Sequence, residues 1–455
     1  MKLVYNVNDR PGLWKTIVFA LQQMLAILAA TIAVPAIIGN GMSQSAALFG
    51  AGVGTLVYLL FTKFKSPVFL GSSFAFLGSM GAAFAGAAST SVGYLGLIIG
   101  AALAGLVYVV IAIAVKYAGT NWIDKIMPAA VIGPTVAIIG LSLAGNAAGD
   151  LLKGSVGIYD LAGNFIPNAS PYVALICGLV TLFTTIVASV YGKKMLKMIP
   201  FIIGICAGYI VASIFTVIGN VADIPALQVV NFALFENMEW VPRFTFIEAF
   251  KGFDAFTPAY FITILVAYVP VAFVVFAEHL SDHKNISSII ENDLTKDPGL
   301  HRTLLGDGIG SMAGAFFGGC PNTTYGESVG CVAISGNASV VTIFTTAIIC
   351  LVASFVGPFV TFLATIPSCV MGGVCVALYG FIAVSGLKMI QKVDLGDNRN
   401  LFTVSVILIA GVGGLKLTFG AVTITSIACA LILGIITNVI VNIKCKCNKE
   451  EKVEE

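Results

Sequence analysis

Residues 320–330, with the sequence CPNTTYGESVG, form a short polar stretch in a chain that is otherwise almost wholly apolar. In lipid the backbone must satisfy its hydrogen bonds within a helix or a closed barrel, and irregular backbone survives only inside protein or beside a cavity. A carboxylate at that depth, here Glu327, costs roughly 3 kcal/mol on insertion scales and by default marks a substrate or ion pathway. The stretch is therefore either a binding site or an irregular loop, and the remainder of the chain decides between the two.

The composition is that of a membrane protein. The 455 residues are 58% hydrophobic and 10% charged, with a mean hydropathy of +0.99, whereas a soluble domain carries about 25% charged residues. The apolar runs are about 17–25 residues long, which suits membrane-spanning helices and not barrel strands. We predict an all-α polytopic membrane protein. The first run, residues 14–38, is too long for the apolar region of a cleavable signal.

The sequence contains no motif that indicates an enzyme. Most of the 10 cysteines lie in apolar runs, where a free cysteine behaves as a small hydrophobic residue. Cys445 and Cys447 form a C-x-C pair in the basic tail, for which metal binding or lipidation is the alternative, but no second Cys/His pair completes a zinc site. Walker, zinc-protease, nucleophile-elbow and dinucleotide motifs are absent from the sequence. We expect no catalytic residue, no metal, no cofactor and no nucleic-acid partner.

Fourteen segments are apolar enough to be spans, and several of them are short. They are residues 14–38, 45–62, 67–82, 92–115, 126–148, 172–191, 199–219, 261–290, 303–318, 320–336, 340–366, 369–390, 400–415 and 420–442. The apolar pattern of 261–290 continues past Ala277, which places Glu278 near the middle of the membrane.

The distribution of basic residues agrees with this count and orients the chain. If both termini are cytoplasmic, all but four of the 24 basic residues fall on the inner side, as the positive-inside rule requires. The four exceptions are Lys153, Arg243, Lys251 and Lys416. A missed or extra span would destroy this alternation.

The fourteen segments divide into two sets of seven at the long connection 224–256. Because seven is odd, two related sets must lie in opposite orientations, which is the inverted repeat of many secondary transporters. Two internal similarities agree: residues 72–76 (SSFAF) correspond to residues 323–327 (TTYGE), and P-x-x-V-x-G occurs both at 128–133 and at 367–372. Each pair lies in equivalent segments of the two sets.

Only four of the 22 acidic residues fall within predicted spans: Glu278, Asp282, Asp307 and Glu327. Glu278 and Asp282 are four residues apart and share one helix face. Buried carboxylates that lie close together favour binding a proton, so these groups can carry a proton through a transport cycle. The alternative is that the helix has already left the membrane and that these are solvated charges. His279 and His283 flank this face and are interpreted only as lining the side of the helix.

The third and tenth segments contain stretches that disfavour a continuous helix, GSSFAF at 71–76 and NTTYGE at 322–327. If both are extended and meet at mid-membrane, their N–H groups and the half-helices that follow would face one cavity. Backbone donors, carboxylate acceptors and the rings of Phe74 and Tyr325 would suit a small planar heterocycle such as uracil. Packing is the alternative for both Phe74 and Phe76, and it is favoured for Phe76.

Several runs together resemble the nucleobase–ascorbate transporters, also called nucleobase–cation symporter family 2. These runs are RPGLWKTIVFALQQMLAILAATIAVPAI (10–37), FLGSSFAF (69–76), AEHLSDH (277–283), DPGLHRTLLGDGIGS (297–311) and PNTTYGESVG (321–330). The resemblance extends over almost the whole chain, and within the family it is strongest to the bacterial uracil permeases.

The resemblance implies a fold and a mode of action. It implies 14 transmembrane segments in two inverted repeats of seven, with short antiparallel β-strands in segments 3 and 10. Residues 14–115 and 258–366 would form a core domain, and residues 126–219 and 369–442 a gate domain. It further implies proton-coupled uptake by alternating access across the bacterial plasma (inner) membrane, and a homodimer through the gate domains.

The resemblance also implies a binding site. Glu278 and Glu327 would bind the substrate through their carboxylates, and Phe74 and Gly326 through backbone amides. Ala30, Tyr325 and Tyr379 match other pocket positions. Glu327, Glu278, Asp282 and Asp307 are the candidates for proton coupling.

One departure from the pattern concerns the substrate. Uracil permeases often have histidine where this chain has Asp282, and Asp282 together with Asp307 is more typical of the purine-transporting branch. That branch typically has another residue, often glutamine, where this chain has Glu327. Because the tenth segment contacts the substrate most directly, uracil is favoured over xanthine or uric acid. A sulfate-permease-like anion transporter of similar architecture and a channel are further alternatives, and the paired carboxylates argue against the former.

Overall fold

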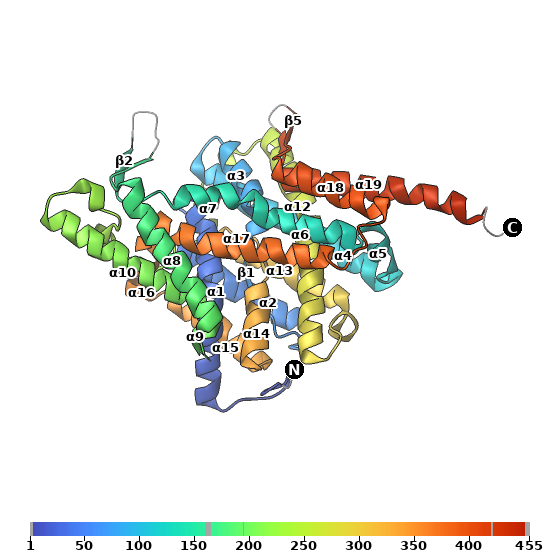
Figure 1. Cartoon of the computed structure of the whole chain (residues 1–455), viewed down its shortest axis with the longest axis horizontal. Coiled ribbons are helices and arrows are strands. Elements are labelled where there is room, and N and C mark those ends of the chain that lie inside the picture. Colours follow the sequence, from blue (N-terminus) through green and yellow to red (C-terminus); the bar gives the residue numbers. More distant parts are fainter. Residues whose placement is uncertain (1–2, 160–164, 194, 420–421, 451–455) are drawn as a thin grey trace.

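The structure is a computed structural model that describes residues 3–159, 165–193, 195–419 and 422–450 of the chain. It is mostly helical (Figure 1). Within these residues, eight helical segments are long and apolar enough to cross a membrane. They are α1 (Leu13–Ile38), α2 (Gln44–Phe61), α4 (Thr90–Ala118), α6 with α7 (Ala129–Asp150), α8 (Pro171–Tyr191), α10 (Pro200–Val221), α12 (Pro258–Ile290) and α17 (Ser368–Ile390).

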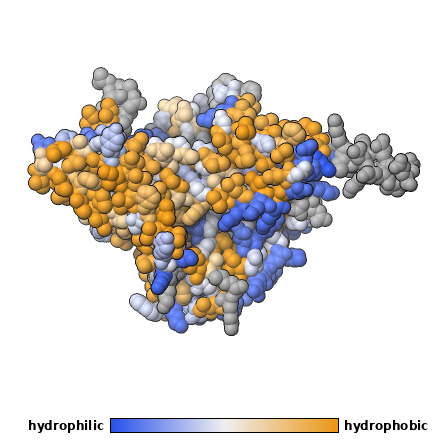
Figure 2. All heavy atoms as spheres, in the orientation of Figure 1, coloured by the Kyte–Doolittle hydropathy of each residue, from blue (hydrophilic) through white to orange (hydrophobic). Residues whose placement is uncertain are grey.

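The surface of the molecule fits a lipid environment. Figure 2 shows a broad hydrophobic band over the side on which α8, α10, α17 and α18 (Asn398–Val412) lie. Large apolar side chains such as Phe183, Val187, Ile210 and Ile214 are exposed there. On a soluble protein an apolar area of this extent would cause aggregation, whereas in a bilayer it contacts acyl chains.

The eight long helices match eight of the predicted spans, and the other six differ in form. Residues 303–318 lie in α13 (Leu300–Gly318), residues 400–415 largely in α18, and residues 426–442 in α19 (Ser426–Glu450). Residues 420–421 of the last predicted span lie outside the described part. Residues 67–82 and 320–336 each combine a strand with a short helix. The total of fourteen spans stays a prediction.

The segment 340–366, which the sequence predicts as one span, is not a single straight helix. It consists of α15 (Val340–Ala353) and α16 (Gly357–Thr365), which are bent by 86° at the break. Pro358 lies at the start of α16, where its missing N–H and restricted backbone favour beginning a new helix over continuing the old one.

The antiparallel strands expected in the third and tenth segments are present. β1 (Leu70–Ser72) pairs with β4 (Asn322–Thr324), with Gly71 opposite Thr323. β1 leads into the short helices η1 (Phe74–Phe76) and α3 (Leu77–Ala85), and β4 leads into α14 (Gly326–Ser335). Two further hairpins were not predicted: β2 (Gly157–Tyr159) with β3 (Phe165–Pro167), and β5 (Leu417–Phe419) with β6 (Val422–Ile424). Strands of three residues are too short to show an alternating pattern.

The helices pack in two groups. In one group α13 packs against α2 and α4, α12 packs against α4, and α1 packs against α2 and α15. In the other, α17 packs against α6 and α8, α10 against α8, and α18 against α6 and α19. Glycines allow the closest approaches: a Cβ on Gly50 of α2 would lie 2.4 Å from the carbonyl oxygen of Gly314 in α13. Such small-residue contacts are the usual way in which membrane helices pack tightly.

Replacing Gly71 of β1 by alanine tests how closely the strand pair packs. A Cβ at this position would lie 2.3 Å from the ring carbon Cε2 of Tyr325, which donates a hydrogen bond to the Ser72 carbonyl oxygen. The ring must move, and overpacking of this kind costs about 1–3 kcal/mol. We expect Gly71→Ala to lower the melting temperature of the purified protein in detergent.

Gly81→Ala is the matched control, because a Cβ on Gly81 in α3 meets no atom within 4 Å. Its melting temperature should be equal to or above that of the unsubstituted protein, since alanine favours helix. Equal melting temperatures for the two variants would contradict the packing described at Gly71.

Candidate binding site

The site is built around the strand pair β1–β4. Hydrogen bonds beyond the paired residues hold its backbone in place. The Ser73 N–H donates to the Pro321 carbonyl oxygen at 2.9 Å, and the Tyr325 N–H donates to the Phe69 carbonyl oxygen at 3.2 Å. These bonds extend the pairing by one residue at each end. The strands are therefore held together although each contains only three residues.

Side chains of neighbouring helices satisfy the backbone groups that the strand pair leaves open. The Thr55 hydroxyl of α2 accepts from the Leu70 N–H at 2.9 Å, and its own proton faces the carbonyl oxygens of Ala51 at 2.8 Å and Leu70 at 3.2 Å. Ser328 of α14 accepts from the Phe69 N–H at 3.0 Å and from the Gln23 amide of α1. This pairing allows non-helical backbone to exist at this depth.

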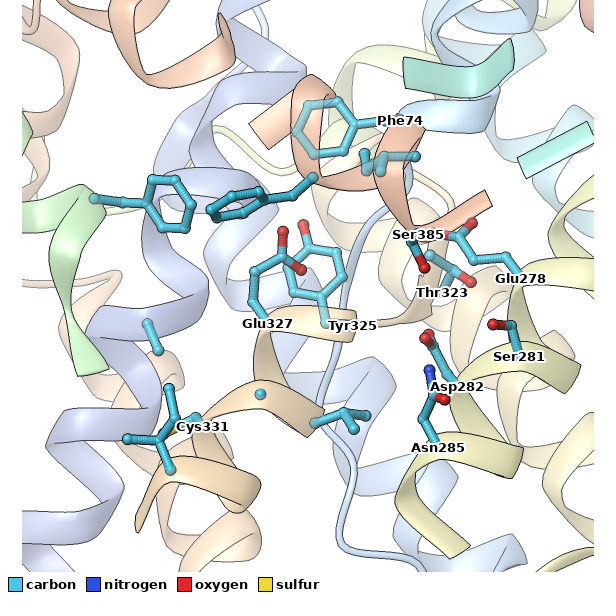
Figure 3. Close-up of a pocket in the computed structure, with 18 of the residues that line it drawn as sticks. Phe74, Glu278, Ser281, Asp282, Asn285, Thr323, Tyr325, Glu327, Cys331 and Ser385 are labelled. Atoms are coloured by element: carbon cyan, nitrogen blue, oxygen red, sulfur yellow. The ribbon is translucent and has the colours of Figure 1, made fainter. Parts of the chain in front are cut away.

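A cavity of about 330 Å³ lies beside the strand pair, and Figure 3 shows its labelled lining residues. Four polar residues on one face of α12 form one wall: Glu278, Ser281, Asp282 and Asn285. Glu327, Tyr325 and Thr323 approach from β4 and the start of α14, and Phe74 from η1. Ser281 and Asn285 were not predicted. Their spacing of three and seven residues from Glu278 places them on the same helix face and could have revealed them.

Three of the four predicted membrane carboxylates line this cavity together. Asp282 is only 8% exposed, and its Oδ2 accepts a hydrogen bond from the Thr324 hydroxyl at 3.0 Å. Glu278 and Glu327 are half-buried. The alternative in which Glu278 and Asp282 are solvated charges beyond the end of a span does not describe this arrangement, because α12 continues to Ile290 and Asp282 is buried.

The aromatic residues separate into lining and packing roles. Phe74 and Tyr325 both line the cavity, and in Figure 3 the Tyr325 ring lies beside the Glu327 side chain. Phe76 instead stacks on Tyr268, with ring centroids 5.5 Å apart, in agreement with the packing interpretation favoured for it.

Two predicted pocket residues do not line the cavity. Ala30 is fully buried in α1, and neither it nor Tyr379 is among the lining residues. Tyr379 of α17 packs edge-on against Phe74, with centroids 5.4 Å apart. It can therefore affect the cavity through the position of the Phe74 ring.

Asp307 is the carboxylate that the structure separates from the other three. Its Oδ2 lies 2.8 Å from Nδ1 of His279, whose Nε2 lies 3.0 Å from the Thr303 hydroxyl. His283 donates from Nδ1 to the His279 carbonyl oxygen at 2.9 Å, and its Nε2 lies 2.8 Å from the Tyr58 hydroxyl. The histidines therefore do more than line the side of α12. They link it to α2 and α13 through a fully buried polar network.

The far wall of the cavity comes from the second helix group. Phe201 of α10 and Phe381, Ile382 and Ser385 of α17 line it, together with Lys197 of the short helix α9 (Met195–Met198). No local sequence signal could have identified these residues, because only the fold brings them opposite α12. Within the described part of the chain, no cluster of three His, Cys, Asp or Glu side chains could hold a metal ion.

Comparisons with known proteins agree on a family. Residues 14–419 match the family described as "Permease family". The uracil permease of Bacillus caldolyticus is 38% identical over 442 residues, covering 96% of this chain and 95% of its own. The uracil permease of Escherichia coli (strain K12) is 34% identical over 450 residues, covering 98% and 96%.

Solved structures show the same fold at lower identity. The transmembrane domain of the cyanobacterium bicarbonate transporter BicA matches with a TM-score of 0.61 and 16% identity, covering 95% of this chain and 99% of that one. The murine Slc26a9 anion transporter matches with a TM-score of 0.64 and 14% identity, covering 96% and 69%. At these identities the likeness concerns the fold alone.

The family match covers most of the chain, and the uracil permeases align over nearly their whole length. These matches agree with the resemblance to the nucleobase–ascorbate transporters that the motifs of this chain indicate. The chain therefore belongs to this permease family and is a multi-pass membrane transporter rather than an enzyme.

Proposed function

We propose that the chain takes up uracil together with protons across the bacterial plasma membrane, by alternating access. The observation that carries this proposal is the cavity in which Glu278, Asp282 and Glu327 meet the rings of Phe74 and Tyr325 beside a pair of broken helices. Relatives named uracil permeases, at 34–38% identity, support the choice of substrate.

The chemistry of uracil complements these groups. Its ring N–H groups can donate to the carboxylates of Glu278 and Glu327, and its carbonyl oxygens can accept from the backbone N–H groups at Phe74 and Gly326. The first N–H groups of a helix have no partner within that helix, and Gly326, the first residue of α14, is exposed to the cavity. Phe74 and Tyr325 provide flat apolar surfaces for the ring.

Proton coupling is proposed for Glu327 and Glu278. Three carboxylates that share one cavity repel one another when all are charged, so a bound proton lowers the free energy of the set. Asp282 has one oxygen engaged by Thr324 and Asp307 is paired with His279, which makes these two the less direct candidates.

The purine alternative, xanthine or uric acid, depended on Asp282 and Asp307. Asp307 does not line the cavity, and Asp282 points one carboxylate oxygen at Thr324. Neither observation supports an additional contact to a second ring, and Glu327, the residue that favours uracil, lines the cavity.

The anion alternative is supported by the fold, since the two structural neighbours described above are a bicarbonate transporter and an anion transporter. Three carboxylates line this cavity, whereas the lining within the described residues contains one basic side chain, Lys197. At the low effective dielectric of a half-buried site, this charge balance repels an anion.

Alternating access would involve the two helix groups as domains. We propose a core domain of residues 14–115 and 258–366 and a gate domain of residues 126–219 and 369–442. The separate packing of the two groups supports this division, as does the position of the cavity between them, with α12 and the strands on one side and α10 and α17 on the other.

The proposed 14-span inverted repeat receives support from the pattern of helix contacts. Several helix contacts occur in pairs that such a repeat would relate: α2 with α15 corresponds to α13 with α4, and α1 with α15 corresponds to α12 with α4. Likewise α8 with α10 corresponds to α18 with α19. We further propose cytoplasmic termini, from the distribution of basic residues, and a homodimer through the gate domains.

The carboxylates are tested by uptake of radiolabelled uracil in cells that produce the variants. A hydrogen bond to a charged group contributes about 1.5–3 kcal/mol, so we expect Glu278→Gln and Glu327→Gln each to lower uptake roughly 10- to 100-fold. Glu239→Gln is the control. Glu239 lies in the long connection 224–256, where it is exposed and paired with Arg243. An unchanged rate and unchanged pH dependence for Glu327→Gln would remove Glu327 from the mechanism.

Substrate choice is tested by competition against labelled uracil. We expect excess unlabelled uracil to abolish the signal and xanthine, hypoxanthine, uric acid, bicarbonate and sulfate to leave it unchanged, with thymine measuring tolerance of a methyl group. A protonophore should also abolish saturable uptake. Strong competition by xanthine or uric acid would favour the purine alternative, and uptake that never saturates would indicate a channel.

Thr324 is expected to position Asp282. Thr324→Val keeps the shape of the side chain but removes the hydroxyl that donates to Asp282, whereas Thr324→Ser keeps the donor. Losing this bond should lower uracil uptake about 10-fold in the valine variant. The serine variant should stay near the unsubstituted rate, and equal loss in both would show that the hydroxyl is not the group that matters.

A further inference from the structure

A second, much smaller cavity lies on the opposite side of the strand pair. Its volume is about 10 Å³, close to the least space that holds one water molecule. Phe76 and Asn322 line it, whereas their neighbours Phe74 and Thr323 line the large cavity. The strand pair β1–β4 and the short helix η1 therefore separate the two cavities.

Two buried polar atoms at this small cavity have no hydrogen-bond partner among the described residues. They are Oδ1 of Asp307 and the hydroxyl oxygen of Tyr108, on side chains that are 1% and 4% exposed. Both residues line the cavity, as does Ser311. Because an unsatisfied buried polar group is destabilising, two such groups beside one small cavity indicate a shared hydrogen-bond partner.

The protons of the neighbouring hydrogen bonds determine which kind of partner Oδ1 of Asp307 can accept. The Thr303 hydroxyl donates to the Leu300 carbonyl oxygen, so Nε2 of His279 must be the donor in its contact with Thr303. A further proton is then needed between Nδ1 of His279 and Oδ2 of Asp307, on one atom or the other, because two lone pairs would repel.

The His279–Asp307 pair is therefore neutral overall wherever that proton resides. In either placement Oδ1 of Asp307 is an acceptor and needs a donor. A cation would leave an uncompensated charge in a fully buried site, which is costly, whereas a neutral molecule with O–H groups would not.

We propose that one water molecule occupies this cavity, donating to Oδ1 of Asp307 and hydrogen-bonding to the Tyr108 hydroxyl, within reach of Ser311. The water links α4 to α13 directly behind β4. It completes the polar network that begins at Thr303 and His279. It also packs against the strand pair on the side away from the large cavity.

A pair of tyrosine variants of the full chain in detergent separates a wet site from a dry one. Tyr108 and Tyr268 both carry buried hydroxyls without a partner in the described chain, but only Tyr108 lines the small cavity. With water present, Tyr108→Phe removes a hydrogen bond and should lower the melting temperature by roughly 1–3 °C. Tyr268→Phe removes an unpaired polar group and should leave the melting temperature unchanged or raise it.

The opposite result for Tyr108→Phe, an unchanged or higher melting temperature, would overturn the proposal, because it means that the hydroxyl is unpaired and the site is dry. An equal loss in both variants would also overturn it. The Tyr108→Phe difference should be the same in sodium, potassium and choline chloride, and a difference present only in sodium would indicate a bound cation instead.

A structure of the protein in lipid nanodiscs, at a resolution that shows ordered solvent, provides an independent measurement. Density within hydrogen-bond distance of both Oδ1 of Asp307 and the Tyr108 hydroxyl is the expected result. An empty cavity, or density that is not within hydrogen-bond distance of either atom, would contradict the water site.

Discussion

The whole arrangement depends on one requirement, which is that non-helical backbone in a membrane must have every N–H and C=O group paired. Two strands of three residues each satisfy part of this requirement by pairing with one another. Neighbouring helices satisfy further groups: the Thr55 hydroxyl accepts from the Leu70 N–H, and the Ser328 hydroxyl accepts from the Phe69 N–H. The helices that supply these side chains must then lie at fixed positions around the strands.

The close helix contacts follow from the same requirement. For Thr55 to reach the backbone of β1, α2 must lie directly against the strand pair. The Asn322 amide reaches the Gly50 carbonyl oxygen at 3.1 Å for the same reason. Glycines at 50 and 54 of α2, opposite Gly314 and Gly310 of α13, leave the necessary room. A larger residue at any of these positions would move a helix away from the strand that it satisfies.

Much of this architecture could be predicted from the sequence. A segment that lies in a membrane must be apolar, so long apolar runs and the polar residues within them are easy to recognise. Long apolar runs predict spans, and GSSFAF and NTTYGE predict breaks, which the strand pair confirms. Glu278 and Asp282 were identifiable because a carboxylate is rare in such surroundings. Ser281 and Asn285 share their helix face. They were not predicted because serine and asparagine in an apolar helix are less unusual than a carboxylate.

Other features could not be predicted, for identifiable physical reasons. Ser385 and Phe201 reach the cavity only because two helix groups meet, which no local pattern encodes. Asp307 looked equivalent to the other membrane carboxylates, since its partner His279 lies 28 residues away in sequence and on another helix. The bend between α15 and α16 was hidden because the apolar composition continues through it. Hydropathy indicates that a segment can lie in the membrane, but it does not indicate whether its helix is straight or bent.

The anchoring of the strands by Thr55, Gln23 and Ser328 has a thermodynamic consequence for recognition. These contacts are made within the protein, so the donors and acceptors at the cavity wall are already oriented before any ligand arrives. Binding then incurs little entropic cost for ordering the site, and most of the interaction energy contributes to affinity. In the proposed uptake of a nucleobase, a preorganised wall of this kind would discriminate between similar rings by geometry, since it could not adapt to the one that fits less well.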